Sequence, residues 1–268
     1  MMDVLLIGYG AIAQEVLKRI QPGEAANINS ILVRANRVSE VRDTVSSRGI
    51  EVVSSLSELS AKPDLIAECA GHSGVREYGV EALRSGTDFL VISIGALADT
   101  ELFAALTLAA KEAGSKLILA AGAVAGADAL AAARVGGLNR VKYTSRKPPK
   151  AWKGTPAEDV ANLDELTEEI TLYQGSAAEA AKRYPQNANV AATIALAGVG
   201  FAKTEVRLVA DPTRDGNLHQ VRAEGAFGSV DIEILGNPLP DNPKTSTLAA
   251  HSVIAEIRRR AEPVEIGG

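Results

Sequence analysis

The stretch Val4-Leu5-Leu6-Ile7-Gly8-Tyr9-Gly10-Ala11-Ile12-Ala13 decides the fold, because an apolar run leads into a Gly-x-Gly-x-x-Ala turn that opens a helix. Gly8 permits the tight turn, Gly10 lets a diphosphate approach the backbone, and Ala13 lets helix and strand pack closely. The start of the helix then offers free N–H groups and the positive end of its dipole. An ordinary turn between strand and helix is the alternative, but the position favours a site for a nicotinamide or flavin dinucleotide. The expected cofactor contacts here are Gly8, Gly10, Ala11 and Ile12.

Strands and helices alternate through the first half of the chain. We expect helices over 11–20, 38–47, 75–84, 100–113 and 127–135, and further strands over 28–33, 51–53, 64–68, 89–94 and 116–120. Continuous apolar runs such as 31–33 are typical of strands that are buried on both faces. The pattern therefore predicts a doubly wound parallel sheet of the Rossmann type.

The pattern changes after Gly136-Gly137. Strands are expected over 141–145, 170–173 and 205–210, the last of these antiparallel, together with an antiparallel pair within 218–235, and helices over 176–184, 190–197 and 247–260. This mixture predicts a second α/β domain. We expect a dinucleotide-binding domain over 1–138, a substrate and dimerisation domain over 139–246, and a C-terminal helix over 247–268 that returns to the first domain.

Composition excludes several classes of protein. The 268 residues carry a mild net charge of −5 without blocks of like charge, so neither nucleic acid nor an anionic membrane is an expected partner. The most apolar stretch, 190–202, is shorter than the ~20 residues of a membrane span. No signal peptide is apparent, and the lone cysteine, Cys69, with three histidines provides no zinc spacing. We expect a soluble, cytoplasmic protein without a metal.

The end of the second expected strand bears on the choice of cofactor. NAD-binding Rossmann units carry an acidic residue here that binds the ribose hydroxyls. This chain has Val33-Arg34-Ala35-Asn36-Arg37 instead. Arg34 and Arg37 could hold a 2′-phosphate and Asn36 could hold a hydroxyl, or the arginines could be solvated surface charges. Both NAD and NADP therefore remain open as cofactors.

Loops after later strands reach the same crevice. In Glu68-Cys69-Ala70-Gly71-His72, the small Ala70 and Gly71 would let the nicotinamide ribose come close. His72 is expected at a helix start, and Cys69 is expected to be an inert thiol. The small-residue loops 93–96 and 122–126 could simply be tight turns.

Polar residues of the second half are candidates for the chemistry. His219 is in phase with Val221 and Ala223, so alternation directs it inward, either as a buried structural histidine or as a catalytic one. Lys147 follows a strand, from which a cation could bind a substrate carboxylate or remain a surface charge. Asn187 and Asn189 precede an apolar helix and could cap it or contact a ligand. His251 is expected to be structural.

Several motifs together resemble the L-aspartate dehydrogenase family across essentially the whole chain. They are Gly8-Tyr-Gly10-Ala-Ile-Ala13, Glu68-Cys-Ala-Gly-His72, Ala133-Arg-Val-Gly-Gly137, Ser145-Arg-Lys-Pro148, Ala151-Trp-Lys-Gly-Thr155, Tyr184-Pro-Gln-Asn-Ala-Asn-Val190, His219-Gln-Val221 and Asn242-Pro-Lys-Thr-Ser246. The resemblance implies a Rossmann domain and a C-terminal α/β domain like that of dihydrodipicolinate reductase, paired as a homodimer. It also implies that His219 is the active-site histidine and that Ala123 and Asn189 contact the nicotinamide cofactor.

The implied reaction is oxidation of L-aspartate by NAD⁺ or NADP⁺ to iminoaspartate, which hydrolyses to oxaloacetate and ammonia or supplies NAD biosynthesis. One imidazole that titrates near neutrality could act as the base and then guide the water. Lys147 and Asn187 are our candidates for binding the substrate carboxylates, and this assignment does not come from the resemblance.

Three other functions compete. A polyol dehydrogenase would typically carry Glu-Lys-Pro where this chain has Ile92-Ser93-Ile94-Gly95. A dihydrodipicolinate reductase would carry a His-His-x-x-Lys signature, which is missing. A non-catalytic NAD(H) sensor would share the glycine turn but would have no use for an inward His219.

Overall fold

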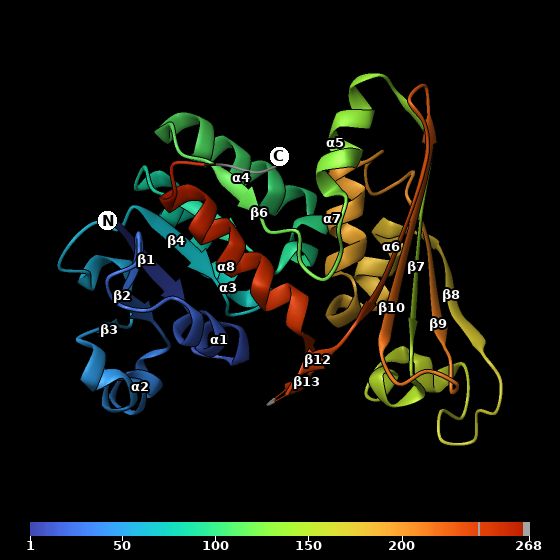
Figure 1. Ribbon diagram of the computed structural model, residues 1–268, viewed down its shortest axis with the longest axis horizontal. Helices are drawn as coiled ribbons and strands as arrows, with labels where there is room; N and C mark the ends of the chain where they lie inside the picture. Colours follow the sequence, from blue (N-terminus) through green and yellow to red (C-terminus); the bar gives the residue numbers. More distant parts are fainter. Residues whose placement is uncertain (241, 265–268) are drawn as a thin grey trace. The chain divides into compact units, whose positions relative to one another are not determined.

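The computed structural model describes residues 1–240 and 242–264, which form two compact units (Figure 1). Of the described residues, the first unit contains Met1–Ala120 and 249–264, and the second contains 121–240 and 242–248. The division after Ala120 comes earlier than the expected boundary at 138. Helix α5 (Ala127–Val135) belongs to the second unit because it contacts helix α7 (Asn189–Ala197) and strand β10 (Asn217–Gly225) there.

A six-stranded sheet forms the centre of the first unit, with strand order β3-β2-β1-β4-β5-β6. Its strands are β1 (Met2–Ile7), β2 (Ala26–Leu32), β3 (Glu51–Val53), β4 (Leu65–Glu68), β5 (Asp88–Val91) and β6 (Leu117–Leu119). Every pairing in the sheet is parallel. The prediction of a doubly wound parallel sheet is therefore confirmed.

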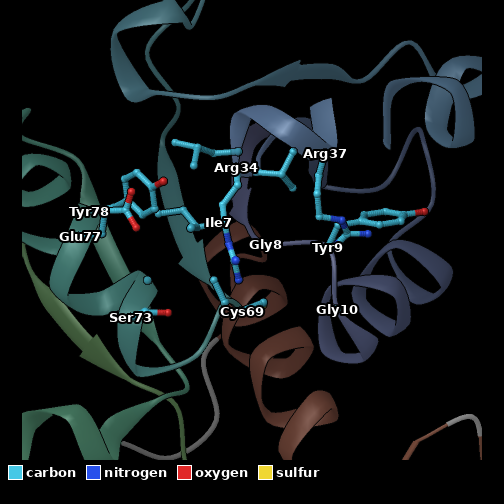
Figure 2. Close-up of a pocket in the computed structure, with 14 residues that line it drawn as sticks. Ile7, Gly8, Tyr9, Gly10, Arg34, Arg37, Cys69, Ser73, Glu77 and Tyr78 are labelled. Atoms are coloured by element: carbon cyan, nitrogen blue, oxygen red, sulfur yellow. The ribbon is translucent and has the colours of Figure 1, made fainter. Parts of the chain in front are cut away.

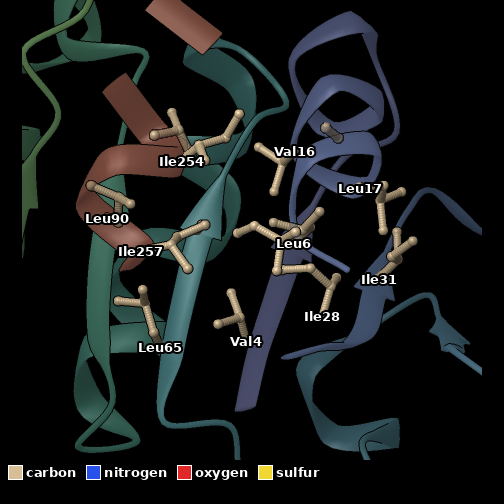
Figure 3. Close-up of a cluster of buried hydrophobic side chains, with 14 of the residues drawn as sticks. Val4, Leu6, Val16, Leu17, Ile28, Ile31, Leu65, Leu90, Ile254 and Ile257 are labelled. Carbon is tan, nitrogen blue, oxygen red and sulfur yellow. The ribbon is translucent and has the colours of Figure 1, made fainter. Parts of the chain in front are cut away.

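The helices of this unit are α1 (Ala11–Arg19), α2 (Val38–Val45), α3 (His72–Arg84), α4 (Thr100–Ala113) and α8 (Thr247–Ala261). Helix α8 comes from the far end of the chain, and its Ile254 and Ile257 join the buried cluster that contains Val4 and Leu6 of β1 (Figure 3). Each such buried isoleucine contributes about 2 kcal/mol to stability. The C-terminal helix is thus part of the first unit's core.

The second unit contains a five-stranded mixed sheet in the order β11-β10-β7-β9-β8. Its strands are β7 (Leu138–Lys147), β8 (Ile170–Ser176), β9 (Glu205–Ala210), β10 (Asn217–Gly225) and β11 (Gly228–Gly236). The expectation of an antiparallel strand over 205–210 is wrong for one of its two neighbours, since β9 pairs antiparallel with β8 but parallel with β7. A parallel pairing needs a long crossover, which here includes β8, α6 (Ala177–Arg183) and α7.

A two-stranded sheet of β12 (Pro238–Leu239) and β13 (Asn242–Ser246) was not anticipated. Helix α7 is largely buried, which accounts for its apolar sequence. Among the described residues, no helix is both long and apolar enough to cross a membrane.

Candidate active site

The glycine turn of the first unit lines a pocket between β1, β2 and α3 (Figure 2). Gly8 has φ +96°, and a Cβ placed there would lie 3.0 Å from Ala70 Cα, from Ala70 Cβ and from the Cys69 carbonyl oxygen. Gly10 is the N-cap of α1 and provides no side chain to cap the helix. The first turn therefore presents its N–H groups to a ligand. The lack of a side chain at Gly8 lets the turn lie against the loop at Cys69 and Ala70, beside the uncapped start of a helix, and this arrangement fits a dinucleotide diphosphate.

Two arginines stand at the end of β2 beside this turn. Arg34 is exposed and has no ion-pair partner among the described residues. Arg37 is half-buried, and its Nη2 lies 2.9 Å from Glu40 Oε1. In Figure 2, Arg34 extends into the pocket and Arg37 lies next to the Tyr9 ring. The pocket thus has a cationic side where NAD-specific units carry a carboxylate.

Four of the seven cofactor contacts expected from the first unit line this pocket, namely Gly8, Gly10, Arg34 and Ala70. The other three are not among the lining residues: Ala11 and Ile12 are the first two residues of α1, and Gly71 is the N-cap of α3. The sequence reasoning missed Tyr9, Ser73, Glu77 and Tyr78. Helix α3 begins next to the pocket, so residues of its first turns lie near it. Ser73 and Glu77 could therefore have been predicted from the expected start of this helix.

A buried carboxylate fastens the loops behind the pocket. Glu68, at the end of β4, is fully buried and accepts hydrogen bonds from the backbone N–H groups of Ala70 and Gly71, both at 2.7 Å. It also accepts from Ser93, through N–H at 3.1 Å and Oγ at 3.0 Å. Burial raises the pKa of Glu68 and outweighs these four donors, which favour the ionised form. Burial also raises the pKa of the Cys69 thiol, so Cys69 stays protonated, as an inert thiol should.

In the second unit, a polar row runs along one face of β7 and β10. Residues 143, 145 and 147 alternate onto this face, and His219 pairs directly with Ser145. His219 is only 4% exposed, and its Nδ1 lies 2.7 Å from the Tyr143 hydroxyl. The predicted inward orientation of His219, in phase with Val221 and Ala223, is confirmed.

His219 is held neutral by its surroundings, so the expectation of an imidazole that titrates near neutrality is wrong for the chain without ligands. Burial, with a smaller contribution from the Lys147 cation, lowers the pKa of His219 to about 3. Burial raises the pKa of Tyr143, so the phenol stays protonated. The Tyr143 hydroxyl and one imidazole nitrogen thus share a hydrogen bond between neutral partners, which fixes the orientation of the ring.

Lys147 and Asn187 lie together in the second unit, as their proposed common task requires. Lys147 Nζ donates to Asn187 Oδ1 at 2.7 Å and lies 5.3 Å from the centre of the Trp152 ring. No carboxylate among the described residues is within ion-pair distance of Lys147, and burial lowers its pKa to about 8. Both residues line a cavity of about 320 Å³, which is also lined by Lys150, Lys153 and Asp215.

The remaining candidates lie elsewhere. Ala123 is buried in the loop before α5, and Asn189 is the first residue of α7; neither lines the two cavities described above. His72 is the first residue of α3, and His251 on α8 lies 3.4 Å from Glu15 Oε1. The described part of the chain contains no group of side chains suited to a metal ion.

Two family models match the chain. Residues 128–260 match "Aspartate dehydrogenase, C-terminal", and residues 8–120 match "Homoserine dehydrogenase, NAD binding domain".

Curated proteins and a solved structure match over the full length. The L-aspartate dehydrogenases of Ralstonia nicotianae and Pseudomonas aeruginosa are 44% and 43% identical to this chain, and each match covers 99% of this chain and 100% of the relative. A crystal structure of aspartate dehydrogenase from Thermotoga maritima is 26% identical, with a TM-score of 0.80 and complete coverage of both chains. The likeness therefore includes both units.

Proposed function

The chain belongs to the L-aspartate dehydrogenase family, and on this premise we propose that it oxidises L-aspartate with NAD⁺ or NADP⁺ to iminoaspartate, which hydrolyses to oxaloacetate and ammonia. The structural observation that carries the proposal is the Lys147–Asn187 pair. The cavity that they line carries three lysines, Lys147, Lys150 and Lys153, against one carboxylate, Asp215. This excess of positive charge, with the Asn187 amide, suits a small dicarboxylate substrate.

The first unit would hold the cofactor. Its diphosphate would lie on the turn at Gly8 and Gly10, which lines the pocket and leaves the start of α1 without a side-chain cap. Ala70 borders the same pocket, and Glu68 holds the loop that carries it. When bound, the nicotinamide accepts the hydride that leaves the substrate Cα, while the protein supplies orientation and electrostatics.

His219 would manage the proton at the substrate nitrogen. A neutral imidazole is the form that accepts a proton, and burial keeps His219 in that form. A bound dicarboxylate brings negative charge and raises the pKa of the imidazole toward neutrality, so the base strengthens when substrate is present. The hydrogen bond between Tyr143 and Nδ1 engages one ring nitrogen, so Nε2 would be the nitrogen that accepts the proton.

Lys147 would bind a substrate carboxylate, with Asn187 as its neutral support. Because the pKa of Lys147 is about 8, its ammonium is charged near neutral pH. Asn187 Oδ1 orients the ammonium without cancelling its charge, which leaves the attraction for an incoming carboxylate. Ala123 and Asn189 remain proposed contacts of the nicotinamide.

The test is a spectrophotometric assay of nicotinamide reduction with the purified chain, L-aspartate, and NAD⁺ or NADP⁺ in separate reactions. L-Glutamate and L-alanine serve as controls, and oxaloacetate with ammonia tests the reverse direction. Turnover confined to aspartate supports the proposal. Nucleotide binding without turnover of any amino acid would favour a sensor.

We also propose that the chain works as a cytoplasmic homodimer and that its iminoaspartate supplies NAD biosynthesis. The family resemblance supports the pairing, as do the exposed apolar side chains of Phe227, in the turn before β11, and of Leu235 on β11. A single, protonated cysteine suits a reducing compartment. Light scattering coupled to size-exclusion chromatography measures the molar mass, and a value near 27.9 kDa would contradict the dimer.

A further inference from the structure

We propose that the pocket at the end of β2 selects NADP(H) over NAD(H), with Arg34 and Arg37 binding the 2′-phosphate of the adenosine ribose. The inference rests on the proposed nucleotide site of the first unit and deepens it by naming the cofactor that the site prefers.

The backbone places Arg34 beside the glycine turn. Ile7 pairs with Leu32 in the parallel β1–β2 register, and the Gly8 N–H donates to the Leu32 carbonyl oxygen at 2.8 Å. Arg34 therefore follows closely after the point where the second strand touches the turn. In Rossmann units, this strand end is where the 2′ position of the adenosine ribose is recognised.

The charges at this strand end suit a phosphate and not a hydroxyl pair. The run from Val33 to Arg37 contains no carboxylate that could accept hydrogen bonds from ribose hydroxyls. Arg34 is exposed and makes no ion pair with any described residue, so its guanidinium charge is not neutralised. A cation without a carboxylate partner is the arrangement that NADP-binding units show here.

Arg37 is held in position by Glu40, and one of its guanidinium nitrogens can still bind a ligand. Its Nε and Nη2 donate to the two oxygens of Glu40, at 3.3 and 2.9 Å. Its Nη1 has no hydrogen-bond partner among the described residues and can donate to a phosphate oxygen. Because Glu40 already fixes this guanidinium, binding a phosphate costs little further side-chain order.

Other charged and polar groups around the pocket do not cancel these cations. Glu77 of α3 is the one carboxylate among the pocket's lining residues, and Tyr78 hydrogen-bonds to it. In Figure 2, Glu77 and Tyr78 lie across the pocket from Arg37 and Tyr9. Glu40 partly compensates the charge of Arg37, so Arg34, which extends between the two sides, is the cation of this pocket without a carboxylate partner among the described residues.

The test is a set of fluorescence titrations of the full-length chain with NADPH and with NADH. Variants Arg34→Ala and Arg37→Ala remove one cation each. Arg84→Ala is the matched control, because Arg84 is an exposed arginine at the end of α3 outside the pocket. Displacement of NADPH by 2′,5′-ADP and by 5′-ADP measures the phosphate contribution on the unaltered chain.

We expect the unaltered chain to bind NADPH at least about tenfold more tightly than NADH, because a hydrogen bond between a guanidinium and the 2′-phosphate stabilises the complex by an amount that corresponds to this ratio. Arg34→Ala should lose about tenfold or more in NADPH affinity with NADH affinity unchanged, Arg37→Ala should show a smaller loss of the same kind, and Arg84→Ala should match the parent. Equal or tighter binding of NADH by the parent, or a loss shared by both nucleotides in Arg34→Ala, overturns the inference.

The outcomes separate this inference from the proposed function. If the chain binds neither nucleotide, the nucleotide site itself is wrong. If it oxidises L-aspartate but binds NADH as tightly as NADPH, the proposed function stands and only the assignment of Arg34 and Arg37 fails. Circular dichroism of each variant detects a folding defect. The displacement experiment uses the unaltered chain, so its result does not depend on how the variants fold.

Discussion

Acidification should destabilise the second unit through His219, by an amount that the structure defines. The unfolded chain binds a proton on this histidine near its ordinary pKa of 6.5, whereas the folded chain resists protonation until about pH 3. Between these values, the unfolded state carries the extra proton, so stability falls as the pH falls. Above pH 6.5, both states are neutral at His219 and the contribution disappears.

Each unit of difference in pKa corresponds to about 1.4 kcal/mol. At pH 5, the penalty from His219 is therefore about 2 kcal/mol, and at pH 4 it rises to about 3 kcal/mol. Other groups of the chain also titrate in this range, so the quantity to measure is the difference between the parent and a variant that lacks the imidazole. His219→Gln keeps a polar group near Tyr143 and cannot titrate.

Trp152 is the reporter, since it is the chain's single tryptophan and is fully buried within the second unit. Urea unfolding followed by its fluorescence gives the free energy of unfolding at pH 7, 5 and 4 for both proteins. The parent should lose about 2 kcal/mol more than His219→Gln between pH 7 and 5. Parallel losses would refute the account, because His219 would then bind a proton equally well in both states.

Three further predictions concern both units. Gly8→Ala should weaken NAD(P)H binding by about tenfold or more in a fluorescence titration, because its φ of +96° and the 3.0 Å approach to Ala70 exclude a methyl group; unchanged affinity would remove the turn from the site. Glu68→Ala should destabilise the first unit by about 3 kcal/mol and Glu68→Gln by less, since the amide retains an acceptor for most donors; thermal unfolding followed by circular dichroism measures both, and equal effects would contradict this role. Lys147→Met should raise the KM for L-aspartate about tenfold and abolish a rise in KM above pH 8, where the parent's ammonium loses its proton; a variant with the parent's pH profile would exclude Lys147 from substrate binding.

The parallel sheet could be predicted because its signal is local. Apolar runs of strand length alternate with amphipathic helices, and each element can be recognised within its own residues. The inward position of His219 could be predicted for the same reason, since side chains alternate between the two faces of a strand with a period of two. The parallel pairing of β9 with β7 could not be predicted, because the pairing of strands that are distant in sequence produces no local sequence pattern.

The contacts that complete each site depend on distant segments. Glu68 stood out as part of a motif, but its hydrogen bonds to Ser93 join the ends of two strands. Tyr143 is 76 residues from His219, and only the β7–β10 register brings their side chains together. Lys147 and Asn187 could be chosen by their chemistry, yet their mutual hydrogen bond required the fold.

The most direct test of the central claim follows the hydrogen at Cα of the substrate. L-Aspartate carrying deuterium at Cα is incubated with the chain and NAD⁺ or NADP⁺, and the reduced nucleotide and the organic product are analysed by mass spectrometry. We expect the deuterium in the reduced nicotinamide, oxaloacetate and ammonia in equal amounts, and no transfer from labelled L-glutamate. Nucleotide that binds but gains no deuterium would contradict the claim that this chain is an aspartate-oxidising enzyme.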